Sequence, residues 1–341
     1  MRPTTPRLMR NIAAATLLAA AALGLVIGLK IAVTLARTLL HGEAPDWSSL
    51  LALHVAPGEL LSILLFAAMM TAEMLIVGWH DSSARILLGD SDSGKTDLWC
   101  LVLGLTRADQ LVVAIATFGT FGLVAAAIPS LAVVPVARDL PFWLAAPLAV
   151  LVVSFVGYWS HRMMHTALFW PLHAFHHAAD ELTVATAFRG HPLDLALEGL
   201  LRMLVPAMLG FPGEAILFAA LCMNAQTLYS HSRMPGLPAL ERLVVFGPRA
   251  HELHHSVEER HHDRNFGTLV IWDRLFGTYI ESEMRPVAIG VDDPERLYRG
   301  NALASMLAVQ ASWMRQIGIL LGVARNRADI SEKVADARSG R

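Results

Sequence analysis

The sequence predicts an all-α integral membrane protein with about four transmembrane helices and a re-entrant or membrane-embedded helical hairpin. It also predicts a cytoplasmic helical cap that holds a histidine-rich site for two metals. Two observations predict this class. Of the 341 residues, 55% are hydrophobic and 16% are charged, whereas a soluble domain is usually about a quarter charged. Twelve of the fifteen histidines lie between His161 and His262.

Four apolar runs are predicted to cross the membrane, at about 11–29, 59–79, 111–136 and 141–160. Each is close to the roughly 20 residues that a helix needs to span the hydrocarbon core. The first run follows a basic start, as in a signal peptide, but it exceeds the apolar core of about 7–15 residues that such signals have. We therefore expect it to stay as an anchor. Glu73, inside the second run, is expected near the membrane interface rather than as a partner within the bundle.

The basic residues predict the orientation. Three arginines precede the first run, the 41–57 loop has no Lys or Arg, and the 80–109 loop has three basic residues. Because basic residues favour the cytoplasmic side, the N-terminus is predicted to lie inside, in the inner membrane. After four crossings His161 then lies inside too. Segments 193–209 and 213–230 are apolar and predict a hairpin that returns His231 to the same side.

The remainder of the chain is predicted to be peripheral. Residues 232–300 are more polar and suggest the cap, and 301–323 suggest either an interfacial amphipathic helix or one that packs on the cap. The predicted division is residues 1–140 for N-terminal transmembrane helices, 141–285 for a catalytic domain and 286–341 for an amphipathic helix with a disordered tail. A formal net charge of −2 and two cysteines argue against nucleic-acid binding, a disulfide framework and a cysteine-based zinc site.

Three histidine clusters are candidate metal ligands. Their spacings are i, i+4 in the first and i, i+3, i+4 in the other two, so each cluster presents its imidazoles on one face of a helix. A lone histidine, His231, precedes the last cluster. The nine residues are His161, His165, His173, His176, His177, His231, His251, His254 and His255.

Nine imidazoles are too many for one metal. A structural zinc takes four ligands and a catalytic zinc takes three with water. The number suits two metals of higher coordination number, and imidazole suits iron, copper, nickel and zinc alike.

With their surroundings, these clusters resemble the fatty acid hydroxylase / sterol desaturase superfamily of integral-membrane di-iron enzymes, over about residues 145–282. The segment Tyr158-Trp-Ser-His161-Arg-Met-Met-His165 resembles the first histidine box of that family, and His173-Ala-Phe-His176-His177 resembles the second. The last box is similar to His251-Glu-Leu-His254-His255. Further similar segments are Arg189-Gly-His-Pro-Leu-Asp194, Gln226–His231, Asn265-Phe-Gly267 and Trp272–Tyr279. The ordered set is specific to the family.

The resemblance implies two iron ions and O2-dependent hydroxylation or desaturation of a lipid C–H bond. It also implies an external electron donor, a ferredoxin or a b-type cytochrome with its reductase, on the cytoplasmic face. The lipid stays open among sterols, hopanoids, ornithine lipids, ether lipids, sphingoid bases, carotenoids and acyl chains. One departure is Ser154, where many members carry an aspartate that would support the ligands.

The sequence also predicts roles for individual residues near the clusters. His191 is expected as a further ligand, as a hydrogen-bond partner of the ligands or as a helix-start residue. Asp194 and Asp273 are expected as a further ligand or as hydrogen-bond partners of the ligands. Asp180, Glu181 and Glu198 could also orient the ligands, and for each of these carboxylates a surface or capping role stays open. His261 and His262 are expected in a solvated loop, and Asn265 is expected to hold a turn. Trp272 and Phe276 are expected to serve packing, and His41, His54 and His80 to lie outside the site.

Two rival functions remain open. His251-Glu252-Leu253-His254-His255 also satisfies HExxH, which gives a zinc protease two ligands and a general base. That reading leaves the other clusters unexplained. A non-catalytic metal- or haem-binding membrane protein is the second rival. Haem needs His pairs inside a helical core, whereas these clusters lie at the ends of the predicted spans.

Overall fold

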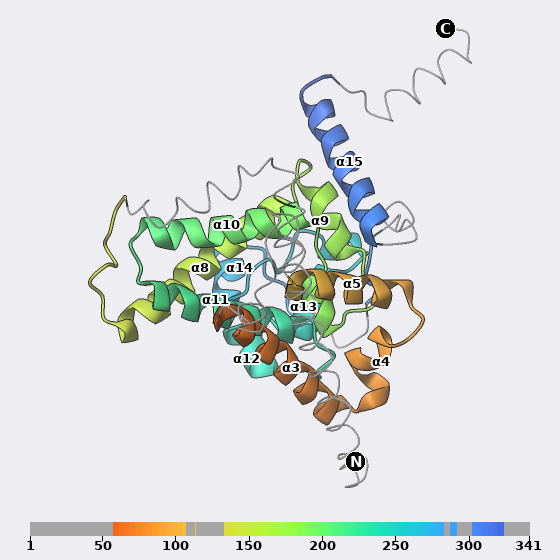
Figure 1. Cartoon of the computed structure of the whole chain (residues 1–341), viewed down its shortest axis with the longest axis horizontal. Helices are drawn as coiled ribbons and strands as arrows, with labels where there is room; N and C mark the ends of the chain where they lie inside the picture. The colour runs from red at the N-terminus through yellow and green to blue at the C-terminus, as the bar shows by residue number, and fades with distance from the viewer. Residues whose placement is uncertain (1–56, 107–112, 114–132, 283–286, 292–301, 324–341) are drawn as a thin grey trace, which may run out of the picture.

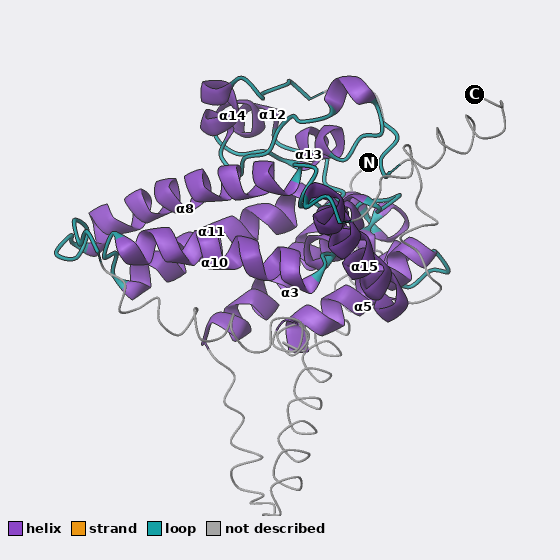
Figure 2. Cartoon of the chain, turned by 90° about the horizontal axis from the view of Figure 1, so that it is seen from above, coloured by secondary structure: helices purple, strands orange, loops and turns teal. Residues whose placement is uncertain are grey.

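The computed structural model describes residues 57–106, 113, 133–282, 287–291 and 302–323. Within these residues the chain is helical, and its only β-type pairing consists of isolated bridges between Val245 and Leu269 and between Ser256 and Ile289. This confirms the predicted all-α class. Figures 1 and 2 show long helices leading into a compact end that carries the shorter ones.

The long helices are α3 (Pro57–Val77), α8 (Phe142–Met164), α10 (Pro192–Met208) and α11 (Gly213–Ser230). Helix α8 packs against α10 and α11, as Figure 2 shows. Ala145 and Ala149 of α8 meet Ala215 and Ala219 of α11 in one buried cluster. Such small side chains let helix backbones approach closely.

The hairpin between α10 and α11 lies where the sequence predicts it. The chain reverses at Gly210, whose φ of +73° favours glycine. A Cβ at Gly210 would lie 2.9 Å from the Cα of Pro135, so the position also needs a residue without a side chain. The reversal lets α10 start, and α11 end, at the same end of α8.

Shorter helices surround that end. They are η1 (Trp79–Asp81), α4 (Ser83–Leu87), α5 (Asp92–Thr106), α9 (Trp170–His177), η3 (Val184–Phe188), α12 (Pro238–Leu243), α13 (Pro248–His254), η4 (Glu259–His261), α14 (Val270–Phe276) and α15 (Ala302–Leu320). Met306 and Val309 of α15 pack with Leu172 and Phe175 of α9. This half of α15 therefore packs on α9, which lies outside the residues 232–300 that were expected to form the cap.

Two described helices are long and apolar enough to cross a membrane, α8 and residues Leu60–Val77 of α3. They correspond to two of the predicted spans. The predicted spans at 11–29 and 111–136 lie outside the described residues, apart from Val113.

Candidate metal centre

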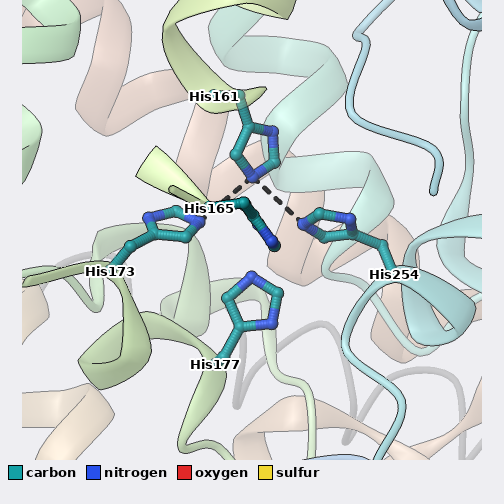
Figure 3. Close-up of side chains that lie close together, drawn as sticks. All are labelled: His161, His165, His173, His177 and His254. Carbon is teal, nitrogen blue, oxygen red and sulfur yellow. Dashed lines mark hydrogen bonds between the residues drawn. The ribbon is translucent and has the colours of Figure 1, made fainter. Parts of the chain in front are cut away.

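All nine candidate histidines meet at the compact end of the molecule. They come from the last turn of α8 with the residue after it, from α9, from the residue that follows α11, and from α13 with the residue after it. Their ligand nitrogens form two groups, and within each group the atoms lie within 4.8 Å of one another. The first group, drawn in Figure 3, is His161, His165, His173, His177 and His254; the second is His176, His231, His251 and His255.

The spacing along each helix sorts the rings between the groups. In α9, His173 and His177 (i, i+4) join the five-histidine group, while His176 joins the four-histidine group. On α13 the i, i+4 pair joins the four-histidine group, and His254 joins the other. The groups adjoin, because the rings of His177 and His255 stack with centroids 4.2 Å apart.

Backbone carbonyls hold four of the rings through Nδ1. Phe266 O accepts from His161 at 2.8 Å, Arg189 O from His176 at 2.8 Å and Thr227 O from His231 at 2.8 Å. Arg264 O accepts from His254 at 2.7 Å. A carbonyl only accepts, so each acceptor assigns the proton to Nδ1 and leaves a lone pair on Nε2.

These lone pairs face one another. The Nε2 atoms of His161 and His254 are 3.0 Å apart, and those of His231 and His176 are 3.4 Å apart. Two lone pairs cannot share a hydrogen bond, but they can share a cation. Two nitrogens about 2.1 Å from one metal, at right angles, lie roughly 3.0 Å apart.

Further nitrogens point to the same conclusion. Nε2 of His165, Nε2 of His177 and Nδ1 of His255 are buried and have no hydrogen-bond partner among the described residues. A buried polar atom without a partner is costly, and a metal ion in the five-histidine group would satisfy the Nε2 atoms of His165 and His177. The donor set therefore fits two metal ions.

Burial keeps these imidazoles unprotonated. It lowers the pKa of His231 to about 4 and, with neighbouring imidazoles, the pKa of His254 to about 3. The pKa of His165, His176, His177, His251 and His255 also lies well below the ordinary value, first because of burial and then because of adjacent rings. Neutral imidazole is the form that binds a metal.

His173 differs because a carboxylate holds it. Its Nδ1 donates to Asp194 Oδ2 at 2.9 Å, and both side chains are buried. Burial lowers the pKa of His173, but the charge and hydrogen bond of Asp194 raise it more, so that its pKa lies above the ordinary value. A carboxylate on the far nitrogen orients a ligand ring and increases its basicity.

Asp273 acts through the loop that holds His161. Its carboxylate accepts from the backbone N–H of Phe266 at 2.8 Å, from that of Gly267 at 2.7 Å and from Thr278 Oγ1 at 2.6 Å. It touches none of the nine rings directly, and it sets the position of the Phe266 carbonyl. A Cβ at Gly267 would lie 2.6 Å from Asp273 Oδ2, so only glycine fits there.

Two buried carboxylates before residue 140 support the site, and the sequence prediction missed both roles. Glu73 accepts from the backbone N–H groups of Ser83 at 2.6 Å and Arg233 at 2.7 Å. Glu73 is fully buried, so it is a partner within the bundle, the alternative that the sequence favoured less. Asp97 pairs with Arg189, whose carbonyl holds His176.

The other singled-out residues are placed as follows. His191 belongs to neither group and caps α10, accepting from the backbone N–H of Leu193 at 3.3 Å. His261 is 3% exposed and bonds Ser256 Oγ at 2.9 Å, so the expected solvated position is wrong for it. His262, Asp180, Glu181 and His80 are exposed, and His41 and His54 lie outside the described residues.

Three further residues for which the sequence gave expectations are Glu198, Ser154 and Asn265. Glu198 pairs with Arg202 at 2.8 Å rather than with a histidine. Ser154 accepts from Trp272 Nε1 at 2.9 Å, so this side chain anchors α14. Asn265, at a φ of +55°, bonds the backbone of Ala250 and Ile280, as expected for a residue that holds a turn.

Comparison with known proteins finds similarity to enzymes whose names refer to lipids. Residues 146–278 match the family model described as Fatty acid hydroxylase. The chain is 30% identical to the human alkylglycerol monooxygenase over 151 residues, and 31% identical to the ornithine lipid hydroxylase OlsE of Rhizobium tropici over 134 residues. It is 32% identical to a Delta(7)-sterol 5(6)-desaturase of Gibberella zeae over 134 residues.

The matches cover 43%, 39% and 39% of this chain and 33%, 40% and 37% of those relatives, in the same order, so the chain matches less than half the length of each. No solved structure matches. The matched region contains all nine converging histidines. The ordered histidine boxes and these similarities support assignment of residues 146–278 to the fatty acid hydroxylase / sterol desaturase superfamily.

Proposed function

We propose that the protein is a membrane-bound di-iron oxidoreductase that uses O2 to hydroxylate or desaturate a C–H bond of a lipid. One observation carries the proposal: nine imidazoles bring their ligand nitrogens together in two adjoining groups of five and four. The relatives are named as a lipid monooxygenase, a lipid hydroxylase and a sterol desaturase. Their names support lipid as the substrate class.

The ligand set supports two metals of high coordination number. Five and four imidazoles exceed the three that a catalytic zinc takes from protein. Of the metals that imidazole suits, iron is proposed because breaking an unactivated C–H bond with O2 requires redox chemistry that side chains lack. The nine histidines would hold the pair, and Asp194 with the Phe266, Arg189, Thr227 and Arg264 carbonyls would keep the rings oriented.

The reaction needs an electron donor. Hydroxylation of R–H consumes O2, two electrons and two protons and yields R–OH and one water, whereas desaturation consumes the same and yields an alkene and two waters. We propose that a ferredoxin or a b-type cytochrome, with its reductase, supplies the electrons at the cytoplasmic face.

We further propose four membrane spans, with the N-terminus, the cap and the histidines on the cytoplasmic side of the inner membrane. Helices α3 and α8 support two of the spans. A reporter fused after residue 45 should lie outside and one fused after residue 330 inside. The opposite pattern would overturn this topology.

The decisive experiment combines metal analysis with lipid analysis. The protein, purified in lipid nanodiscs, should contain two irons per chain. Cells that lack the protein should accumulate the unmodified lipid. Compared with the lipid of the parent strain, it should have one oxygen atom fewer or two hydrogen atoms more. One zinc per chain, or an optical spectrum with a haem Soret band, would contradict the proposal.

The zinc protease receives no support from the geometry. His254 occupies an unspecified position of HExxH, yet its Nε2 lies 3.0 Å from that of His161 inside the five-histidine group. A protease site gives this residue no role. The comparison of His254 with Glu252 therefore separates the two functions, as described in the Discussion.

A further inference from the structure

An exposed apolar surface lies on the cap and is not used by the metal centre. We call it the α12–α14 patch, and it consists of Leu237, Leu240, Leu243, Val244, Ile271 and Leu275. Each of these side chains is exposed, with Leu243 at 72% and Leu275 at 66%. Exposed apolar side chains that gather in one place mark an interaction site.

The two halves of the patch are joined by hydrogen bonds. The backbone N–H of Val270 donates to Val244 O at 3.0 Å, and Arg274 Nη2 donates to Arg242 O at 2.9 Å. Figure 2 shows α12 and α14 together on one side of α8. The exposed side chains therefore form one surface rather than two separate groups.

The patch continues onto a candidate membrane span. Trp272 and Phe276 of α14 pack on Phe155 of α8, with ring centroids 5.0 and 6.3 Å apart. Leu151, Phe155 and Trp159 of α8 are themselves exposed, and their i, i+4 spacing puts them on one face of the helix. This exposed stripe of α8 thus leads directly to the patch.

Two exposed tryptophans indicate the depth of the patch. Trp143 and Trp159, 75% and 42% exposed, lie 16 residues apart on α8, or about 24 Å along a helix. Tryptophan is enriched at both membrane–water interfaces. Trp159 therefore marks the interface at the end that carries the histidines, and Phe276 packs on it with ring centroids 5.0 Å apart.

The charges that α12 and α14 themselves expose are positive, and one of them, Arg242, lies 3.7 Å from the exposed carboxylate of Glu281. The acidic residues of α12 and α14, Glu241 and Asp273, are buried, so the charges that these two helices expose are Arg242 and Arg274. The guanidinium of Arg162 lies 5.4 Å from the ring of Trp159. Exposed guanidinium groups beside an apolar surface match a bilayer with anionic headgroups.

We propose that the α12–α14 patch is immersed in the cytoplasmic interface of the bilayer. Its leucines, Val244 and Ile271 lie among the acyl chains, and Arg242 and Arg274 lie at anionic headgroups. The inference rests on the membrane setting of the proposed function. It adds that the cap, as well as the spans, contacts the lipid.

The test uses a fluorescent label on single cysteines in the full-length protein. Cys222 is replaced by serine, and Cys100 stays because burial raises the pKa of its thiol to about 12, which leaves it unreactive. A label at Leu243→Cys or Leu275→Cys, in nanodiscs of brominated phosphatidylcholine with phosphatidylglycerol, should be quenched by the brominated chains and protected from aqueous iodide. A label at Asp90→Cys, whose side chain is fully exposed, should show the reverse.

The outcomes separate the candidate occupants. If iodide quenches the labels at 243 and 275 as efficiently as the label at 90, the patch faces water and the proposal is wrong. Protection from both quenchers would instead identify a protein, either a partner or a second copy. The double variant Arg242→Glu/Arg274→Glu should raise iodide quenching at 275 several-fold, whereas Arg242→Lys/Arg274→Lys should not.

Metal content is measured on the same samples. If the labels lie in the acyl region but no iron is bound, the membrane contact of the patch stands and the proposed function is wrong. If two irons are bound but the labels face water, the proposed function stands and the membrane contact is wrong.

Discussion

Arg189 and Asp97 form an ion pair, Nη1 to Oδ1 at 2.9 Å, in which both side chains are fully buried. The same guanidinium donates to Ser93 Oγ and to the carbonyl of Phe175, and the backbone oxygen of Arg189 holds His176. One residue therefore links α5, which precedes the matched domain, to a candidate ligand of the four-histidine group.

Asp97→Asn should destabilise the protein and weaken this group. The substitution leaves the Arg189 charge buried without a counter-charge, which typically costs about 3–5 kcal/mol. We expect a lower thermal midpoint, and metal lost from the four-histidine group before the five-histidine group, measured as metal stoichiometry across a chelator titration. A stable Asp97→Asn protein with full metal would contradict the assigned role.

Two controls accompany this variant. Asp90→Asn removes an exposed carboxylate, 3.7 Å from Lys95, and should change stability by about 0.5 kcal/mol or less. Adding Arg189→Met to Asp97→Asn should recover part of the stability, because it removes the uncompensated charge.

Asp194→Asn should weaken metal binding without unfolding the bundle. The amide can still accept from His173 Nδ1 but brings no negative charge, so the ring becomes a poorer ligand. Loss of such a partner typically reduces metal affinity about 10–100-fold. Chelator competition measures the affinity, and Glu214→Gln, an exposed acid on α11, is the matched control. An unchanged affinity would show that the Asp194 charge does not act on the site.

His254→Ala and Glu252→Gln should have opposite consequences for function. His254 lies in the five-histidine group, so its removal should abolish lipid oxidation and lower the metal content. Glu252 belongs to neither group, and its amide variant should keep much of the activity. Lipid analysis of cells that express each variant measures both. An active His254→Ala with an inactive Glu252→Gln would instead support a zinc protease, in which the glutamate activates water.

The stability of chelator-treated protein should fall as the pH falls from about 7 to about 5. In the unfolded chain the imidazoles titrate near 6.5, whereas burial lowers the pKa of His231 to about 4 and of His254 to about 3. The unfolded state therefore binds more protons in this range, and stability rises with pH.

His173, whose pKa is raised, contributes with the opposite sign, but the rings with a lowered pKa outnumber it. Thermal unfolding across the range measures the effect, and metal-loaded protein should shift less because the metal opposes protonation. A midpoint that rose on acidification would contradict the assignment of neutral rings.

The convergence of the nine histidines could be predicted because spacing on a helix is a local property. An i, i+4 pair faces one direction wherever the helix lies, so the members of each sequence cluster could be proposed before their neighbours were known. Gly210 likewise signals a reversal through its own backbone preference. These features depend on a few consecutive residues.

The groups that hold the histidine rings and their loops in place were harder to predict, because they join segments that are distant in the sequence. Asp97 lies 92 residues before Arg189, and no local pattern connects them. The carbonyls that assign the tautomers, such as those of Phe266 and Arg264, are backbone atoms, which every residue type carries. Glu73 did give a signal, since a charge within an apolar run usually has a function, but its partners at Ser83 and Arg233 follow only from the fold.

The placement of His161 two residues beyond Trp159 on α8 bears on regioselectivity. If Trp159 lies at the interface, the reacting centre lies at the depth of the lipid headgroups and not at the bilayer midplane. A bond near the polar end of the lipid can reach this level with its chain extended, whereas a bond near the terminal methyl would require the chain to fold back. We therefore expect oxidation within a few carbons of the polar end.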